Sequence, residues 1–233
     1  MLITYQQSSE HAESVVDTIT ALGRRALALR ADSAEASALV GTVEAALDAF
    51  GRIDILVNNA AVFVVEPVES LDPTEGERTI AVNVRAPFVA AQATAGHMPS
   101  GRRIISIGSN LSERTVFPGF TLYAMSKTAL IGMTEDLARE LGPRGITANL
   151  VNPGPADTDT NPADGPHADT IRGLTALGRY AAPDEIAATV AFLAGDAAQY
   201  ITGAVINVDG GSRRKPRPHG GRISPGSTET GAS

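Results

Sequence analysis

The stretch Ile104-Ile-Ser-Ile-Gly-Ser109 decides the fold, because it is an apolar run that ends in small polar residues and is followed by a helical pattern. That helix is expected over Leu122–Leu141, where Gly142-Pro143 closes it, and another strand is expected over Ile146–Val151. Apolar runs without alternation are typical of strands that are buried on both faces. Strands that alternate with helices predict an α/β fold with a doubly wound parallel sheet.

The same alternation continues on both sides of this stretch. Further strands are expected at Leu2–Tyr5, Ala26–Arg30, Ile53–Val57, Arg103–Ile107 and Ala204–Val208. Further helices are expected from a cap at Ser8 or Ser9 to Leu22, from Ala34 (capped by Ser33) to Phe50, over Thr74–Ala95 and over Pro183–Leu193. The first of these carries an apolar stripe of Val15, Val16, Ile19 and Leu22, and Gly23 and Gly51 are expected to end the first two. The segment 153–165 is expected to be a mobile loop.

Size and composition predict one soluble globular domain with a real core, since the 233 residues are 43% hydrophobic and 19% charged. The chain has no cysteine, so a disulfide framework and a thiolate metal site are both excluded. Its four histidines show no ligand spacing, and no metal site is expected. No long apolar run and no signal peptide are evident, which favours a cytoplasmic protein without a membrane partner.

Charge is distributed unevenly along the chain. The net charge is −7, but residues 212–233 hold five of the 19 basic residues and only one of the 26 acidic ones. The remaining 14 basic and 25 acidic residues give the body a charge of −11, which argues against a nucleic-acid-binding surface. One folded domain is therefore expected over residues 1–211, followed by a disordered basic tail over 212–233. The tail is either a tether for nucleic acid or membrane, or a frame-shifted or read-through segment.

The pentapeptide Tyr123-Ala-Met-Ser-Lys127 carries the clearest chemical signal, together with Ser109 fourteen residues upstream. Positions i and i+4 share a helix face, so the phenol and the ammonium can point into one space. A phenol titrates near about 10, and a nearby cation lowers that pKa. With a serine hydroxyl beside it, the phenol could exchange a proton with a ketone or an alcohol. Alone, the same spacing also fits a solvated helix face.

The motifs taken in order resemble those of the short-chain dehydrogenase/reductase family, near its 3-oxoacyl-carrier-protein reductase-like members. The resemblance runs from Leu2 to Gly211 and rests on Asn58-Asn59-Ala60-Ala61, Asn83, Ser109, Tyr123-Ala-Met-Ser-Lys127 and Asn152-Pro153-Gly154. It implies a Rossmann-like fold and an NADP-dependent oxidoreductase that interconverts a ketone and a secondary alcohol. The partners it implies are a small carbonyl or alcohol substrate and further copies of the chain.

The resemblance also implies roles for four catalytic residues. Tyr123 would donate or accept the proton at the substrate oxygen, and Ser109 would orient the carbonyl. Lys127 would lower the pKa of Tyr123 and hydrogen-bond the nicotinamide ribose. Asn83 would hold a water that joins Lys127 to solvent, a role compatible with that of a helix-kink residue.

The implied cofactor site is only partly present in the sequence. The segment Tyr5-Gln6-Gln7-Ser8-Ser9 holds no acid that would repel a 2′-phosphate, which favours NADP, with NAD still possible. Asp32 resembles the carboxylate that binds adenine, although it could also be an ordinary N-cap. The full set implied for the cofactor is Tyr5, Ser8, Asp32, Asn58, Ala60, Ala61, Tyr123, Lys127, Pro153, Gly154 and Thr158.

No G-x-x-x-G-x-G sequence occurs in the chain, although this family places one, with a strand, before the strand that corresponds to Leu2–Tyr5. That strand would be central in the order 3-2-1-4-5-6, so its loss should leave unpaired backbone groups on both sides. Three explanations are open. Either the start is assigned too late, or the chain is an N-terminally truncated remnant, or the sheet closes without the strand.

Two further expectations follow from the resemblance. Residues 155–178 would form a lid over the substrate. Homo-tetramers or homo-dimers would form through the two long helices, where the apolar residues are Val82, Val89, Ala93, Leu130, Met133 and Leu137, each of which could equally belong to the core. Against the enzyme stand two alternatives: a nucleotide-binding regulatory protein without turnover, and an inactive remnant.

Overall fold

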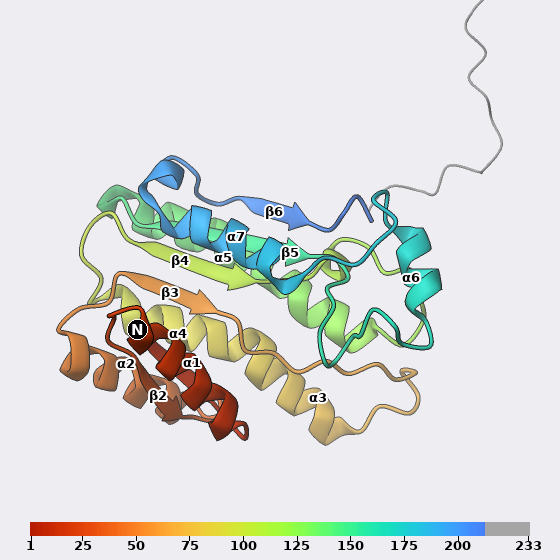
Figure 1. Cartoon of the computed structure of the whole chain (residues 1–233), viewed down its shortest axis with the longest axis horizontal. Helices are drawn as coiled ribbons and strands as arrows, with labels where there is room; N and C mark the ends of the chain where they lie inside the picture. Colours follow the sequence, from red (N-terminus) through yellow and green to blue (C-terminus); the bar gives the residue numbers. More distant parts are fainter. Residues whose placement is uncertain (213–233) are drawn as a thin grey trace, which may run out of the picture.

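The computed structural model describes residues 1–212, in which parallel strands alternate with helices (Figure 1). The strands are β1 (Leu2–Tyr5), β2 (Leu27–Arg30), β3 (Ile55–Asn58), β4 (Arg103–Ile107), β5 (Thr147–Pro153) and β6 (Val205–Val208). The α-helices are α1 (Ser9–Ala21), α2 (Ala36–Phe50), α3 (Pro73–Ile80), α4 (Ala86–Ala95), α5 (Thr121–Leu141), α6 (Ala168–Leu174) and α7 (Pro183–Ala194). The predicted α/β class with parallel strands is confirmed, whereas the predicted basic tail lies outside the described residues apart from Ser212.

The sheet is divided into two parts. β1 pairs with β2, while β3, β4, β5 and β6 pair in that order, and every pairing is parallel. Because β1 does not pair with β3, the idea that the sheet closes up without a further strand is wrong. On β3, Ile55 and Val57 remain 45% and 43% exposed. These exposures are large for a strand of a doubly wound sheet, whose faces are normally covered.

The core lies on both faces of the four-stranded sheet, where α7 lies in front of the strands and α4 and α5 lie behind them (Figure 1). Successive strand residues point to opposite faces, so Ile104 packs with Ile146 in one cluster and Ile105 packs with Val151 and Leu193 in the other. Ile104 and Ile105 are each 1% exposed. Burial on both faces explains why this strand is a continuous apolar run in the sequence.

The helix expected over residues 74–95 is three segments instead of one. α3 is capped by the Asp72 carboxylate, which accepts a hydrogen bond from the backbone N–H of Thr74 at 2.8 Å. A π-helical segment, Ala81–Arg85, follows and leads directly into α4. Single π-turns inside helices are frequent at functional sites, and this one contains Asn83.

Two expectations about the first two helices need correction. α2 starts two residues later than expected, because the Asp32 carboxylate and not Ser33 accepts the N–H of Ala34, at 2.9 Å. Val15 of α1 is 44% exposed and Leu22, one residue beyond the end of α1, is 74% exposed, so half of the predicted stripe faces outward. α1 packs against the small β1–β2 sheet, which offers little surface to cover a full stripe.

Some residues proposed for contacts between copies of the chain belong to the core. Val82 is 5% exposed and Leu130 is 1% exposed, so neither offers surface. Leu137 is partly buried and packs against the cluster that contains Ile104. Across residues 1–212, no helix combines the length and the apolar character that a membrane span requires.

Candidate active site

Three of the four predicted catalytic side chains meet where β4 ends and α5 begins. Ser109 follows β4 and is 7% exposed, and its hydroxyl lies close enough to the phenol of Tyr123 to affect the pKa of that phenol. Lys127 lies one turn further along α5, is 2% exposed, and donates from Nζ to the carbonyl oxygen of Ile107 at 2.8 Å. Its Nζ lies 5.9 Å from the centre of the Tyr123 ring. The i, i+4 spacing therefore places the phenol and the ammonium in one space, as the sequence predicted.

Asn83 joins this group through a residue that the sequence analysis did not single out. Its amide accepts from the N–H of Val62 and donates to the carbonyl of Val62, both at 2.9 Å. The same amide donates to Ser126 Oγ at 3.0 Å, and Ser126 Oγ donates to the carbonyl oxygen of Tyr123 at 2.7 Å. Asn83 thus ties the segment after β3 to the first turn of α5. Its proposed role in holding a water stays a prediction.

The ionisation of the two central groups differs from the expectation. Burial raises the pKa of the Tyr123 phenol, and the hydrogen bond from Ser109 opposes this rise. Burial also lowers the pKa of the Lys127 ammonium, from 10.5 to about 8. The loss of water around the phenol is the largest effect on its pKa, and the expectation that Lys127 lowers that pKa stays a prediction. At neutral pH the phenol is protonated and the amine is charged.

Asn152 supports Ser109 from the neighbouring strand. This side chain is 0% exposed, and its Oδ1 accepts from the backbone N–H of Ser109 at 3.1 Å. Its Nδ2 donates to Ser112 Oγ at 3.0 Å. A Cβ added at Gly108 would lie 2.1 Å from Asn152 Oδ1. Because Gly108 has no side chain, the Asn152 amide has room to reach the turn that carries Ser109.

Replacing Gly108 with alanine is expected to push the Asn152 amide away from Ser109. The variant should lose about 1–3 kcal/mol in free energy of unfolding, because buried polar groups are left without partners. Gly132→Ala is the matched control: it lies in α5, where an added Cβ meets no atom within 4 Å. The control should gain about 0.5–1 kcal/mol. Urea denaturation of both variants checks this, and equal stabilities would show that Gly108 has no such role.

The residues expected at the adenine end of a cofactor lie after β1 and β2. Asp32 Oδ2 accepts from Gln6 Nε2 at 2.9 Å, and Arg78 of α3 contacts the same carboxylate at 3.4 Å. Its pKa is lowered, chiefly by the hydrogen bond from Ala34 N–H and secondarily by Arg78. Asp32 therefore stabilises its own turn, as an ordinary cap would, and also presents a charged carboxylate. Tyr5 ends β1 and Ser8 precedes α1, where its side chain makes no capping bond.

The remaining residues of the predicted set lie at the carboxyl ends of β3 and β5, on either side of Ser109. Asn58 ends β3 and donates to Ser106 Oγ at 3.2 Å, with Ala60 and Ala61 just beyond. Pro153 ends β5, and a Cβ at Gly154 would lie 2.6 Å from the backbone of Asp209. Thr158 forms a short bridge with Asn161. Ligands of open α/β sheets bind at this edge of the strands.

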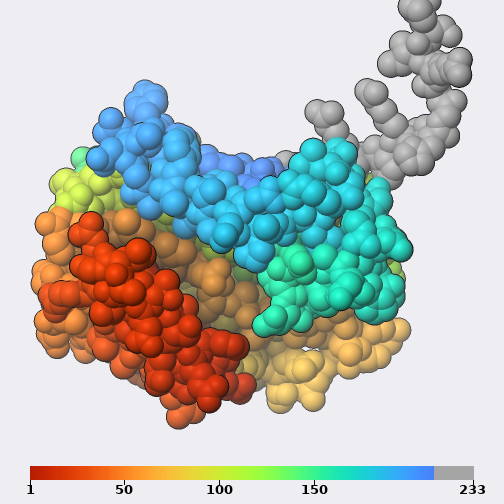
Figure 2. Space-filling model, viewed as in Figure 1, coloured from red at the N-terminus to blue at the C-terminus, as the bar shows by residue number. Residues whose placement is uncertain are grey.

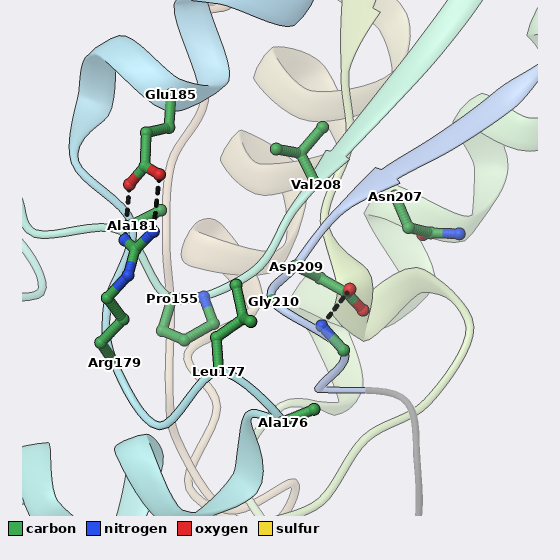
Figure 3. A pocket seen from close by; sticks show the side chains of 11 residues that line it. Pro155, Ala176, Leu177, Arg179, Ala181, Glu185, Asn207, Val208, Asp209 and Gly210 are labelled. Carbon is green, nitrogen blue, oxygen red and sulfur yellow. Dashed lines mark hydrogen bonds and ion pairs between the residues drawn. The ribbon is translucent and has the colours of Figure 1, made fainter.

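The segment after β5 contains α6, a helix that the sequence analysis did not predict. In the space-filling view the teal surface of the segment after β5 lies just above the tan surface of the region around α3 (Figure 2). A cavity of about 420 Å³ lies further along, at the carboxyl end of β6, and is lined by Pro155, Leu177 and Asp209 among others (Figure 3). The ion pair of Arg179 with Glu185, at 2.6 Å, borders it. None of the four predicted catalytic residues lines this cavity.

Comparison with known proteins identifies several relatives. Residues 1–213 match the family model described as Enoyl-(Acyl carrier protein) reductase. The chain is 43% identical over 185 residues to the cyclic-di-GMP-binding biofilm dispersal mediator protein of Escherichia coli K12, covering 79% of this chain and 76% of that protein. It is 49% identical to a blue fluorescent protein from a metagenomic library, solved with NADPH, and to a short-chain dehydrogenase of Burkholderia cenocepacia J2315, solved with NADP. Each structure superposes with a TM-score of 0.90 and covers 91% of this chain and 87% of its own.

Proposed function

Because this chain belongs to the short-chain dehydrogenase/reductase family, we propose that it is an NADP-dependent oxidoreductase that interconverts a ketone and a secondary alcohol. Tyr123 is the acid and base of the reaction. The observation that carries the proposal is the phenol of Tyr123, which lies beside the Ser109 hydroxyl and the buried ammonium of Lys127. Three functionally unrelated residues would not be expected to converge in this way.

Each of these groups has a separate task at the carbonyl. The Ser109 hydroxyl orients the carbonyl oxygen, and the Tyr123 phenol transfers its proton to that oxygen as negative charge develops there. Since the pKa of Tyr123 is raised, the phenol is protonated at neutral pH, which suits the direction of ketone reduction. The Lys127 ammonium stabilises the phenolate that remains. NADPH, when bound, supplies the hydride that adds to the carbonyl carbon.

The residues present fit a nicotinamide cofactor at its two ends. The Lys127 ammonium has three N–H donors and, within residues 1–212, one hydrogen bond, to the Ile107 carbonyl, so two donors remain for ribose hydroxyls in a buried position. Asp32 and Gln6 offer a carboxylate and an amide at the adenine end. The neutral segment Tyr5–Ser9 favours NADP over NAD, as do the cofactors of the two structural neighbours. The glycine-rich phosphate loop is not among residues 1–233.

The surroundings of the site are part of the same proposal. Residues 155–178, including α6, form the lid over the substrate. Copies of the chain associate as dimers or tetramers through α4 and α5, where Val89, Ala93 and Met133 are partly exposed, and the protein works in the cytoplasm. Light scattering after size-exclusion chromatography measures the assembly, and a monomer at micromolar concentration would remove that part of the proposal.

The test of the proposed reaction is oxidation of NADPH in the presence of a panel of simple ketones, followed by its absorbance. The protein is expected to consume NADPH with at least one ketone, and to release the corresponding alcohol. NADH under the same conditions should be a poorer cofactor, because no group at Tyr5–Ser9 favours an unphosphorylated ribose. NADPH consumption no faster than in the absence of protein would contradict the proposal.

A second candidate function is nucleotide binding without turnover, and it is favoured by one observation. A relative that is 43% identical is described as binding cyclic di-GMP. We infer that cyclic di-GMP, if it binds, occupies the edge formed by the carboxyl ends of the strands, near Asp32 and Lys127. Titration with cyclic di-GMP by calorimetry, with and without saturating NADPH, tests this idea. Competition would support it, and the absence of any heat of binding would remove it.

A further inference from the structure

An aromatic cluster surrounds the phenol of Tyr123. The ring of Phe63 meets the Tyr123 ring edge to face, with centroids 4.7 Å apart and an angle of 83° between the planes. Phe120, which precedes α5, lies 5.9 Å from Phe63 by the same measure. Edge-to-face contacts at these separations are favourable for aromatic rings. The hydroxyl that acts at the carbonyl is therefore held beside aromatic walls.

These walls are accessible to a ligand. Phe63 is 46% exposed, Val65 is 43% exposed and Phe117 is 39% exposed. The two loops that carry them are joined by a hydrogen bond from the N–H of Glu66 to the carbonyl of Gly119, at 3.0 Å. A surface with several exposed apolar side chains in neighbouring loops usually marks a binding site. Here Phe63 joins this surface to the site, because its ring contacts the ring of Tyr123.

We propose that the substrate carries an aromatic or bulky apolar group next to its carbonyl, and that Phe63 is the residue that selects it. This inference rests on the proposed function. The apolar group would pack against Phe63 while the carbonyl oxygen meets Tyr123 and Ser109. The carbonyl carbon gains the hydride of a reduced nicotinamide and the oxygen gains the Tyr123 proton, so that the products are an alcohol and the oxidised nicotinamide.

The occupant is a small molecule because of the chemistry at the centre of the patch. Small-molecule sites have mostly hydrophobic and aromatic walls with a few placed polar groups, and here those groups are the Tyr123 phenol and the Ser109 hydroxyl. Ser126 Oγ accepts from the Asn83 amide and donates to the backbone carbonyl of Tyr123, so the turn from which the phenol projects is fixed before a ligand arrives. A partner protein could pack on the apolar patch without a phenol held in a defined position.

The test compares acetophenone with butanone as substrates for the whole chain, using Phe63→Ala and Phe63→Leu. The wild type is expected to have the higher kcat/KM for acetophenone. Phe63→Ala should lower that kcat/KM by about 10-fold or more while changing the value for butanone by less than about 3-fold, since apolar contacts discriminate by about 10–200-fold. The kcat/KM of Phe63→Leu for acetophenone should lie between the values of the wild type and Phe63→Ala. Phe192→Ala is the matched control, because Phe192 is 48% exposed but lies on α7.

The outcomes separate this inference from the function on which it rests. Turnover of butanone with no preference for acetophenone, or an equal loss for both ketones in Phe63→Ala, would overturn the inference and leave the oxidoreductase intact. If neither ketone turns over, the proposed function fails, and saturation-transfer NMR of acetophenone then decides the inference separately. Transfer to the phenyl protons that is lost in Phe63→Ala and kept in Phe192→Ala supports it. No transfer in the wild type overturns it.

Discussion

Replacing Tyr123 with phenylalanine is expected to lower kcat for ketone reduction by about 10²–10⁴-fold, the usual contribution of a positioned acid or base. The substitution removes one hydroxyl and keeps the ring that packs edge to face with Phe63. The fold should therefore be preserved, and so should the affinity for NADPH, since Lys127 is unchanged. Steady-state kinetics and a fluorescence titration with NADPH measure the two quantities on one preparation.

The control for this variant is Tyr200→Phe, which removes the same hydroxyl from a side chain that is 100% exposed. It should behave as the wild type. If Tyr123→Phe kept more than about a tenth of the wild-type kcat, the phenol would not be the proton donor, since general acid catalysis contributes about 10²–10⁴-fold. If affinity for NADPH fell in parallel with kcat, Tyr123 would have a binding role and its assignment as the acid would lose its support.

The second large effect is expected for Lys127→Met, which should lower kcat by about 10²–10³-fold, as removal of a preorganised electrostatic group does elsewhere. The reason is the loss of positive charge 5.9 Å from the ring on which a phenolate develops. Methionine is unbranched and apolar, so it suits a helix position that is 2% exposed. A kcat within about 3-fold of the wild type would remove Lys127 from the mechanism, because even one lost donor usually costs more.

The same variant should reveal the cost of burying the ammonium. The pKa of Lys127 is about 8 in the folded protein and 10.5 in the reference state, so the unfolded chain binds more protons between these values. The free energy of unfolding of the wild type should then rise with pH across that window, by up to about 3 kcal/mol. Lys127→Met should lack this rise. Urea midpoints of both proteins between about pH 7 and about pH 10 measure the difference, and parallel curves would contradict it.

Much of the fold could be predicted because the strands are apolar runs. The bounds of β1 and β4 agree with the expectation, and the helix that carries Tyr123 is displaced by one residue at its start. The π-helical segment at Asn83 could not be predicted, because its local pattern is that of an ordinary helix. Asn83 in this segment contacts Val62 and Ser126, which lie 21 and 43 residues away. The short helix α6 has too few residues to show a period.

The candidate site shows the same division between local and distant causes. The spacing of Tyr123 and Lys127 predicted their common face, the end of the apolar run pointed to Ser109, and the resemblance supplied the role of each. The Asn152 contact with Ser109 spans 43 residues and needs the pairing of β4 with β5. The ionisation of Tyr123 depends on how much water remains around the phenol, which spacing does not encode. Burial is also why Val82 and Leu130 belong to the core and not to a contact between copies.

The most direct test of the account is transfer of deuterium to acetophenone or butanone from NADPH that carries deuterium at both hydrogen positions of the reactive carbon of the nicotinamide. Mass spectrometry of the alcohol reports the result. The account predicts an alcohol with one deuterium at the carbinol carbon from the wild type, and none from Tyr123→Phe within the same time. An alcohol without deuterium, or no alcohol from protein that binds NADPH, would contradict the claim that this chain is an oxidoreductase.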